Sequence, residues 1–408
     1  MVKSMVAGLL SGSRGTYAAE EVREDEALLS LLGLRGAPEE ATVWRVLWDL
    51  GEESMASRLA EVQCQWVRRI LHRAPRRDLL VEGFFPIFGD GSLLEGSPLR
   101  EGTKMMEGKG LGLLWATIFA GPLVAAQRIV GEGEGEESAV RAMLPDVVGK
   151  ILKPVKLHGS ALVLLDSLHG DGPTLDGIES LRLHYIVGAN KLAETDRILQ
   201  EQPEVAWQET GEHQGRGWAE SGVCLCRIEC KDWSKKRLLV GRRWKTPGEF
   251  LWHYAGVITD LDEERVSHLM ERGRSFAEAI WHLYDHKGAM EDYYKDLLED
   301  LGLHHPPCRE HVRNLGFYAV ATPAHTLAAG VDLIGGKSRE RASRRRHDGK
   351  QRKRPRPRRM RLWRIRRRLF ALPARLAYHG RLLTVTILGA GVRIRRHFEH
   401  YFLNVCRC

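Results

Sequence analysis

The sequence has few cysteines and no long apolar run, and both absences narrow the classes of protein to consider. Seven cysteines stand among 408 residues without the regular spacing of a disulfide framework, which is typical of a reducing compartment. No apolar stretch approaches the length of a membrane-spanning helix, and Met1–Leu10 is too weakly apolar for a secretion signal. We therefore expect an intracellular, cytoplasmic protein that is not embedded in a membrane.

Cysteine pairs with zinc-binding spacing are also missing. Cys224, Cys226 and Cys230 form a C-x-C-x3-C group, but the group lacks the C-x2-C spacing of a zinc knuckle. It lies in a strand-like run, VCLCRIEC. We interpret these three cysteines as packing residues.

Charge is distributed unevenly along the chain. The net charge of +9 combines 24 Lys and Arg against three Asp and Glu in residues 337–408 with 38 against 50 in the rest. A strongly basic segment on an acidic body predicts a polyanionic partner. Pro355 and Pro357 exclude one regular helix in residues 337–368. We expect a largely disordered or induced-fit arm that contacts phosphates, with a solvated linker as the alternative.

Apolar periodicity and chain breakers divide the sequence into five segments. These are a helical N-terminal region with possible DNA-end binding (1–80), the first part of a core (81–200), a β-rich insertion (201–260), further core helices (261–336), and a basic arm with an amphipathic helix (337–408). The N-terminal helices are expected at Glu20–Leu32, Pro38–Leu50 and Glu52–His72. The last two, with Gly51 between them, are compatible with a helix-turn-helix or with a purely structural pair.

Residues 81–188 predict the order strand, strand, strand, helix, strand, helix, strand. The expected elements are Val81–Asp90, Leu111–Ala120, Leu123–Val130, Ser138–Leu152, Ala161–Leu165, a helix capped by Thr174 that runs through Leu181, and His184–Val187. Later helices are expected at Asp262–Arg274, Ser275–Leu301, 311–334 with an interruption near Pro323, and within 360–388. The pattern predicts a mixed α/β fold.

Two of the expected strands end on a carboxylate. Asp90 closes the first strand, and Asp166 follows the wholly apolar Ala161–Leu165. A carboxylate at the end of a buried strand is held rigidly while its oxygens reach solvent, as a metal ligand requires. Asp171 and Asp176 compete with Asp166, but only Asp166 terminates the strand. His169 lies in the following loop and is interpreted as a surface or substrate-contacting residue.

A late helix adds a third acid. Tyr284, Lys287, Glu291 and Lys295 recur at three- and four-residue steps and should share one helix face. Alone, this pattern is typical of a surface ladder of ion pairs. Two acids at strand ends and one Glu on a late helix, however, are the arrangement of a two-metal site for phosphoryl transfer.

At these positions the sequence resembles the DDE transposases of bacterial insertion sequences. The matching motifs are GDGS (Gly89–Ser92), LLDSLHGDGPTLDGIE (Leu164–Glu179), YIVGANK (Tyr185–Lys191), Y-x2-K-x3-E-x3-K (Tyr284–Lys295), LGLHHPPCREHVRNLGFYAV and RLWRIRRRLFALPARL. The resemblance covers roughly residues 81–388. Lys287 stands where related signatures usually have Arg, and a lysine cannot grip a phosphate with two parallel N–H groups.

The resemblance implies an RNase H-like mixed sheet interrupted by a β-rich insertion. It implies a metal-binding catalytic triad of Asp90, Asp166 and Glu291 that holds two Mg²⁺ ions, with Mn²⁺ as a substitute. The implied activity is cutting and joining double-stranded DNA at element ends and target, by a homo-oligomer assembled on DNA. The residues expected to contact DNA are Tyr284, Lys287, Lys295, Arg344, Arg345, Arg346, Lys353, Arg354, Arg358 and Arg359.

Two alternatives to a transposase stay open at this point. One is a metal-dependent nuclease that cleaves DNA without strand transfer. The other is a catalytically inactive DNA-binding remnant of a transposase. Retention of all three carboxylates favours an active enzyme.

Deletion of residues 337–368 tests the role of the basic arm. We expect affinity for all duplex sequences to fall about equally and the dependence of log Kd on log salt to flatten, because phosphate contacts release counterions without reading bases. Titration of random and element-end duplexes at several salt concentrations measures both effects. Unchanged affinity and salt dependence would show that the arm makes no phosphate contacts.

Overall fold

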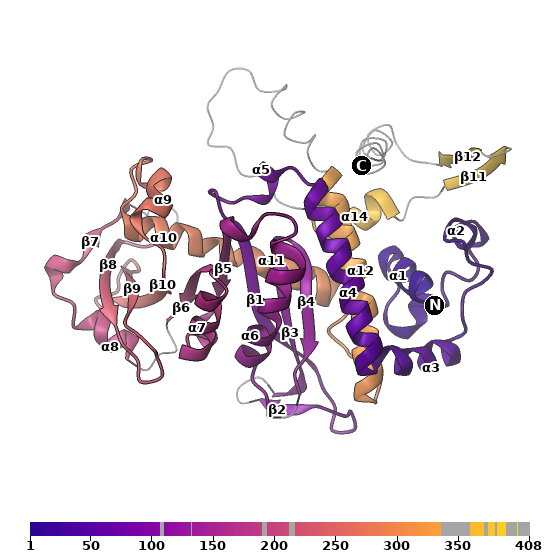
Figure 1. The fold of residues 1–408 in the computed structure, drawn as a ribbon, viewed down its shortest axis with the longest axis horizontal. Helices are drawn as coiled ribbons and strands as arrows, with labels where there is room; N and C mark the ends of the chain where they lie inside the picture. Colours follow the sequence, from indigo (N-terminus) through magenta and orange to yellow (C-terminus); the bar gives the residue numbers. More distant parts are fainter. Residues whose placement is uncertain are drawn as a thin grey trace, which may run out of the picture.

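The structure is a computed structural model, and its side chains and backbone are described for most of the chain. The described residues are 1–106, 110–131, 133–189, 194–211, 217–335, 360–370, 374–379, 382–388 and 398. Within them the protein is mixed α/β, with a mixed sheet at its centre (Figure 1). The predicted α/β class is therefore confirmed.

The central strand of the sheet is β1 (Phe85–Glu95). On one side it pairs antiparallel with β3 (Gly110–Ala120), which forms a hairpin with β4 (Leu123–Ile129) and also pairs with the short β2 (Lys104–Met106). On the other side β1 pairs in parallel with β5 (Ala161–Leu165), and β5 pairs in parallel with β6 (His184–Gly188). The hairpin around Gly121-Pro122 and the strand Ala161–Leu165 form as the sequence predicts.

Both faces of the sheet are buried under helices. Along β5, Leu162 and Leu164 belong to one core cluster, whereas Ala161, Val163 and Leu165 belong to the other. This alternation explains why the strand is apolar at every position, because side chains at successive residues point to opposite faces. Helices α6 (Glu136–Val147) and α7 (Gly172–Ser180) contribute to the second cluster, and α10 (Phe276–Tyr284) and α12 (His311–Gly335) to the first.

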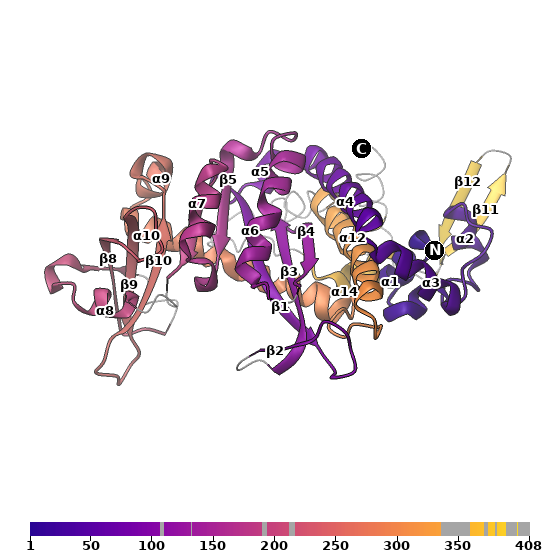
Figure 2. The same ribbon diagram turned by 60° about the horizontal axis from the view of Figure 1, so that its bottom comes forward.

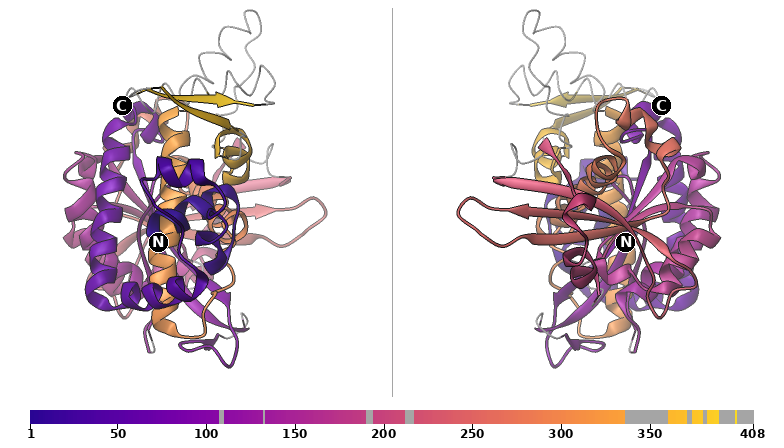
Figure 3. Two further views of the ribbon diagram at one scale, coloured as in Figure 1. Left: turned by 90° about the vertical axis from the view of Figure 1, so that its right-hand side faces the viewer. Right: turned by 90° about the vertical axis from the view of Figure 1, so that its left-hand side faces the viewer.

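The residues expected to form a β-rich insertion (201–260, called the insertion below) continue the same sheet. Strand β10 (His253–Thr259) pairs antiparallel with β6. The strands β9 (Arg237–Lys245), β8 (Glu220–Ile228) and β7 (Gln208–Glu209) follow in order. The opposite side views in Figure 3 place these strands at one end of the molecule and the N-terminal helices at the other. Cys224 and its two neighbours in the C-x-C-x3-C group pack in or against the second core cluster, as predicted.

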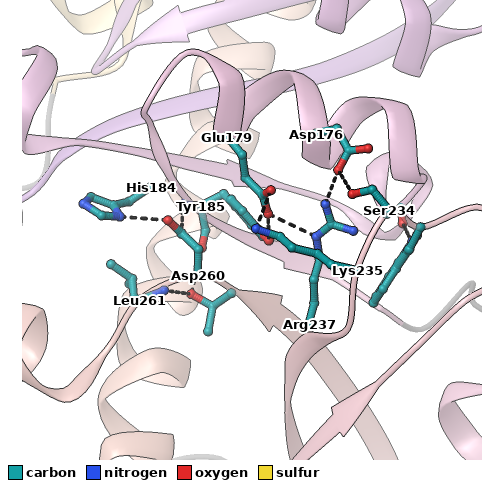
Figure 4. Close-up of polar contacts among 12 residues, drawn as sticks. Asp176, Glu179, His184, Tyr185, Ser234, Lys235, Arg237, Asp260 and Leu261 are labelled. Carbon is teal, nitrogen blue, oxygen red and sulfur yellow. Dashed lines mark hydrogen bonds and ion pairs between the residues drawn. The ribbon is translucent and has the colours of Figure 1, made fainter.

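An ion-pair network around the buried Arg237 guanidinium fastens the insertion to helix α7 (Figure 4). The Arg237 guanidinium, 2% exposed, pairs with Asp176 and donates from Nε to Glu179 Oε1 at 3.1 Å. The Tyr185 hydroxyl donates to the same Glu179 oxygen at 2.9 Å, and Lys235 lies 2.8 Å from the other. Burial opposes ionisation of Glu179, but these donors outweigh it and lower its pKa.

The N-terminal region is helical and lies on the β4 and α12 side of the molecule, opposite the strands of the insertion (Figure 2). Its elements are α1 (Val2–Ser11), a 3₁₀ turn (Gly15–Ala19), α2 (Glu26–Leu31), α3 (Glu40–Gly51), α4 (Glu53–Arg73) and α5 (Arg76–Leu79). Helices α1, α3 and α4 pack on α12. The approach of α3 is close: a Cβ on Gly51 would lie 1.8 Å from the Val312 carbonyl oxygen, and one on Gly316 would lie 2.1 Å from that of Leu47.

Four expected boundaries near the site are wrong. Strand β1 continues past Asp90 to Glu95, because β3 supplies hydrogen-bonding partners along the whole stretch. Helix α6 begins at Glu136 and not at Ser138. The cap of α7 is Asp171, whose carboxylate accepts the Thr174 N–H at 2.9 Å, so Gly172 and Pro173 occupy the first turn. The expected helix over 275–301 is four segments: α10, a 3₁₀ turn (Asp285–Gly288), α11 (Ala289–Lys295) and a π-helical turn (Asp296–Asp300).

Two further expectations fail in the C-terminal third. Helix α12 runs without interruption through Pro323, whose missing N–H is tolerated inside a helix packed on three others. Within 360–388 the helical part is short, α14 (Leu362–Ile365) and a turn (Arg366–Phe370). The strands β11 (Ala374–His379) and β12 (Leu382–Ile387) then form a hairpin, and β12 is rich in the β-branched residues that favour strands.

In the described part of the chain, no helix is both long enough and apolar enough to cross a bilayer.

Arg237→Ala tests the buried network. We expect the free energy of unfolding to fall by about 2–4 kcal/mol, because Glu179 and Asp176 lose a desolvated partner. Lys235→Ala is the matched control: Lys235 is 59% exposed, and loss of such a surface pair costs about 0–1 kcal/mol. Urea unfolding followed by circular dichroism measures both. Equal losses in the two variants would contradict a structural role for the buried guanidinium.

Candidate functional site

The parallel pairing of β1 and β5 brings Asp90 and Asp166 together. Phe88 pairs with Leu164. Asp90 lies two residues after Phe88, and Asp166 lies two residues after Leu164. Two residues is the side-chain repeat of a strand, so both carboxylates leave the sheet toward the same face. Asp166 is the N-cap of the 3₁₀ turn Ser167–His169, and its Oδ1 accepts a hydrogen bond from the Leu168 N–H at 2.9 Å. The two acids are partly exposed, at 23% and 34% of their side chains.

A third carboxylate, from Glu136, joins the two aspartates. Glu136 is the first residue of α6 and is 3% exposed. It reaches the cluster over Gly91, where a Cβ would lie 2.4 Å from Glu136 Oε2. Gly89 allows α6 to approach β1 closely at a second point, because a Cβ added there would lie 2.7 Å from Val140 Cγ1 of the same helix. The glycines of GDGS are therefore explained by the packing of α6 against β1.

His169 completes the cluster from the other strand end. It is fully buried, and its Nε2 lies 3.2 Å from Glu136 Oε1 and 3.8 Å from Asp166 Oδ1. Asp90, Glu136 and His169 each place a potential ligand atom within 4.8 Å of the others. The interpretation of His169 as a surface residue was wrong, because the 3₁₀ turn after Asp166 brings the imidazole to the buried Glu136.

Glu136 was not among the expected site residues, because it lies in the run GEGEGEE, two residues before the expected helix start at Ser138. An acid in the first turn of a helix is a common signal of a helix start. Placing the helix start at Glu136 would have made it a candidate for the site.

The three carboxylates of the cluster do not ionise alike. Burial raises the pKa of Asp90 to about 7; Lys287 opposes this rise, whereas the charges of Glu136 and Asp166 add to it. For Glu136, burial also opposes ionisation, but hydrogen bonds with His169 and Asp90 outweigh it and lower the pKa to about 2. In the metal-free protein the shared proton therefore resides on Asp90, and Glu136 stays ionised.

A cavity of about 620 Å³ opens over Asp90 and is lined on its far side by the α10–α11 segment. Although a 3₁₀ turn separates the two helices, all four residues of the predicted face line this cavity: Tyr284, Lys287, Glu291 and Lys295. Lys287 Nζ lies 3.9 Å from Asp90 Oδ2. Arg242 of the insertion strand β9 also lines the cavity, with its guanidinium 3.8 Å from the centre of the Trp281 ring.

Two tyrosines fix the helices to the strands that carry the aspartates. The Tyr284 hydroxyl donates to the Leu165 carbonyl at 3.1 Å, directly before Asp166. The Tyr294 hydroxyl donates to the Asp90 carbonyl at 2.7 Å and is also bonded to Thr117. These bonds link the position of α10 and α11 to that of the carboxylate cluster.

The competing acids are engaged elsewhere. Asp171 caps α7 and pairs with Arg141 at 3.2 Å, and Asp176 pairs with Arg237. Of the residues expected to contact DNA, the seven basic residues of the arm lie outside the described residues: Arg344, Arg345, Arg346, Lys353, Arg354, Arg358 and Arg359.

The donor set of the cluster fits a divalent cation. Three carboxylates supply hard oxygen ligands. Burial, together with the charges of Glu136 and Asp166, keeps a proton on Asp90 that a cation would displace. Lys287, Lys295 and Arg242 add positive charge around the same cavity. Acids that hold a cation beside bases that hold a phosphate are what phosphoryl transfer requires.

Comparisons with known proteins find a weak structural likeness. No protein-family model matches the chain, and no curated protein matches it. Among solved structures the chain is similar to a piggyBac transposase in a synaptic complex with hairpin DNA, with 10% identity and a TM-score of 0.33. The match covers 66% of this chain and 55% of that chain. A likeness this weak leaves the function to be argued from the site.

Asp90→Asn tests the electrostatics of the cluster. In EDTA, folded Asp90 keeps its proton up to about pH 7, whereas its pKa in the unfolded chain is the ordinary 3.8. Stability from this residue is therefore complete below pH 4 and is lost as the pH rises to 7. We expect the variant to match the wild type near pH 4 and to exceed it by about 1–4 kcal/mol at pH 8.

Urea unfolding between pH 4 and pH 8 measures this difference. The amide of the variant can still donate to Glu136, as protonated Asp90 does, so the comparison isolates the charge. A variant less stable than the wild type at pH 8 would contradict the raised pKa.

Proposed function

We propose that this protein cuts and joins DNA strands by divalent-metal phosphoryl transfer, as a DDE transposase with an RNase H-like core. The observation that carries the proposal is the meeting of Asp90 and Asp166 at adjacent parallel strands, beside a cavity lined by Glu291 and three basic residues. The strand arrangement supports the proposed core, since β1 lies between an antiparallel hairpin and two parallel crossover strands.

Asp90 and Asp166 would hold the metal, with Glu291 contributing from the opposite wall of the cavity. Glu291 is exposed on α11, so its carboxylate is available to the cavity. When bound, Mg²⁺ or Mn²⁺ supplies Lewis-acid activation of an attacking oxygen and stabilises the leaving oxygen. Glu136 and His169 would position Asp90 and Asp166 from beneath, since both are buried and both contact the cluster.

The basic residues would bind and orient the DNA backbone. Lys287 Nζ lies 3.9 Å from Asp90 Oδ2, and a lysine displaced from that contact can bind a neighbouring phosphate as a point charge. Lys295 and Arg242 line the same cavity, so one strand would be gripped on both sides of the reacting phosphate. The basic arm would add sequence-independent affinity, and a homo-oligomer would hold two DNA ends together.

Charge-removing variants test the assignment. We expect Asp90→Asn, Asp166→Asn and Glu291→Gln each to lower the rate of strand nicking on the order of 10³-fold or more while leaving duplex binding nearly unchanged. Each amide is close in shape to its acid but lacks the charge that a divalent cation requires. Asp171→Asn is the matched control, because asparagine also caps helices and Asp171 lies outside the cluster.

The assay uses an element-end duplex with Mg²⁺, Mn²⁺, Ca²⁺ or EDTA. Nicking followed by joining supports a transposase. Nicking without joining would instead support a metal-dependent nuclease that lacks strand transfer. Ca²⁺ should permit binding with little cleavage, because its longer and looser coordination suits the reaction poorly. Undiminished cutting in EDTA, or full activity in Asp166→Asn, would refute the proposal.

A further inference from the structure

A second group of potential metal ligands lies in the turn before β1, on α10 and in the 3₁₀ turn that follows α10. Glu82, His282 and His286 each place one potential ligand atom within 4.8 Å of the others. The two histidines are four residues apart and so share one side of the helical segment, and their ring centres lie 5.3 Å apart. None of the three lines the cavity over Asp90.

Glu82 is held by a turn that a glutamate rarely occupies. Its φ is +46° and that of Gly83 is +84°, and two hydrogen bonds of 2.7 and 2.9 Å between Val81 and Phe84 close the turn. Two central residues with positive φ are favoured as Asn-Gly or Gly-Gly. A non-glycine residue with a strained backbone of this kind often occurs at a functional site, where its side chain makes a specific contact.

Helix α9 (Glu263–Met270) and the residues after it orient the Glu82 carboxylate. Arg272 donates from Nη1 to Glu82 Oε2 at 2.8 Å, and His268 Nε2 lies 2.9 Å from the Glu82 carbonyl oxygen. The other carboxylate oxygen, Oε1, lies 3.6 Å from His282 Nε2. Support of one ligand oxygen by a second residue is a common feature of metal sites.

We propose that Glu82, His282 and His286 bind one Zn²⁺ ion, or a similar borderline transition metal. Ligand atoms around a tetrahedral zinc lie roughly 3.3 Å apart, close to the 3.6 Å between Glu82 and His282. Two imidazoles and one carboxylate favour Zn²⁺, Co²⁺ or Ni²⁺ over Mg²⁺. The side chains of Glu82 and His282 are 14% and 26% exposed, so an ion can enter and keep a water ligand.

An ion at this site would connect two parts of the protein. It would join the turn that leads into β1 to the residue directly before Lys287, which lies 3.9 Å from Asp90. The ion would thus fasten the α10 segment to the strand that carries Asp90. This inference stands apart from the proposed DNA chemistry, because it uses none of the residues of that cluster.

Binding to the full-length protein, after treatment with EDTA and dialysis, tests the site. We expect one equivalent of Zn²⁺ by calorimetry, visible d–d absorption when Co²⁺ is used as the probe, and a raised melting temperature with either ion. His282→Ala and His286→Ala should each weaken binding at least about tenfold. Failure of the wild-type protein to bind would overturn the proposal.

Two further variants separate metal loss from misfolding and from binding at the carboxylate cluster. Glu82→Gly removes a ligand but suits the positive φ, so the apoprotein should fold and melt as the wild type does while zinc binding weakens. Asp90→Asn should keep zinc binding at full strength. Zinc binding that is unchanged in Glu82→Gly, or that is lost in Asp90→Asn and retained in His286→Ala, would assign the ion elsewhere and overturn the proposal.

Discussion

The four-residue parallel pairing of β1 with β5 is the constraint on which the candidate site depends. It sets Phe88 opposite Leu164 and thereby places Asp90 and Asp166 at matched positions beyond the last pair. A slip of one residue would turn one carboxylate to the other face of the sheet. The register is protected because both faces of β5 are buried, so a slip would also exchange its two sets of core side chains.

Bringing acids together in a partly buried place costs free energy, and the structure shows how that cost is reduced. Asp90 retains a proton and lies near Lys287, while Glu136 is stabilised by His169. Gly91 leaves room for the Glu136 carboxylate. If the proposed cation binds here, it would replace the proton on Asp90, and metal affinity would then be linked to the stability of the core.

The insertion is part of this arrangement because its strands extend the same sheet. Its strand β9 supplies Arg237 to the network under α7 and Arg242 to the cavity over Asp90. The two arginines are five residues apart on one strand. The ion pairs of Arg237 therefore help to position the guanidinium of Arg242. Fastening the insertion to α7 is therefore also a way of shaping the cavity.

Much of this architecture was determined by local sequence. The apolar run Ala161–Leu165 predicted a strand buried on both faces, and Gly121-Pro122 between two apolar runs predicted a hairpin; both form. The steps between Tyr284, Lys287, Glu291 and Lys295 placed them on one wall of the cavity even across a 3₁₀ turn.

Tertiary structure decided what local patterns cannot encode. Glu136 and His169 entered the cluster through the packing of α6 and a turn, and neither contact follows from spacing in the sequence. The same holds for Glu82, which lies about two hundred residues from the histidines it meets. Helix α12 passes through Pro323 because three packed helices outweigh one missing hydrogen bond. Periodicity reports which face of an element is buried, but only packing reports which side chains meet there.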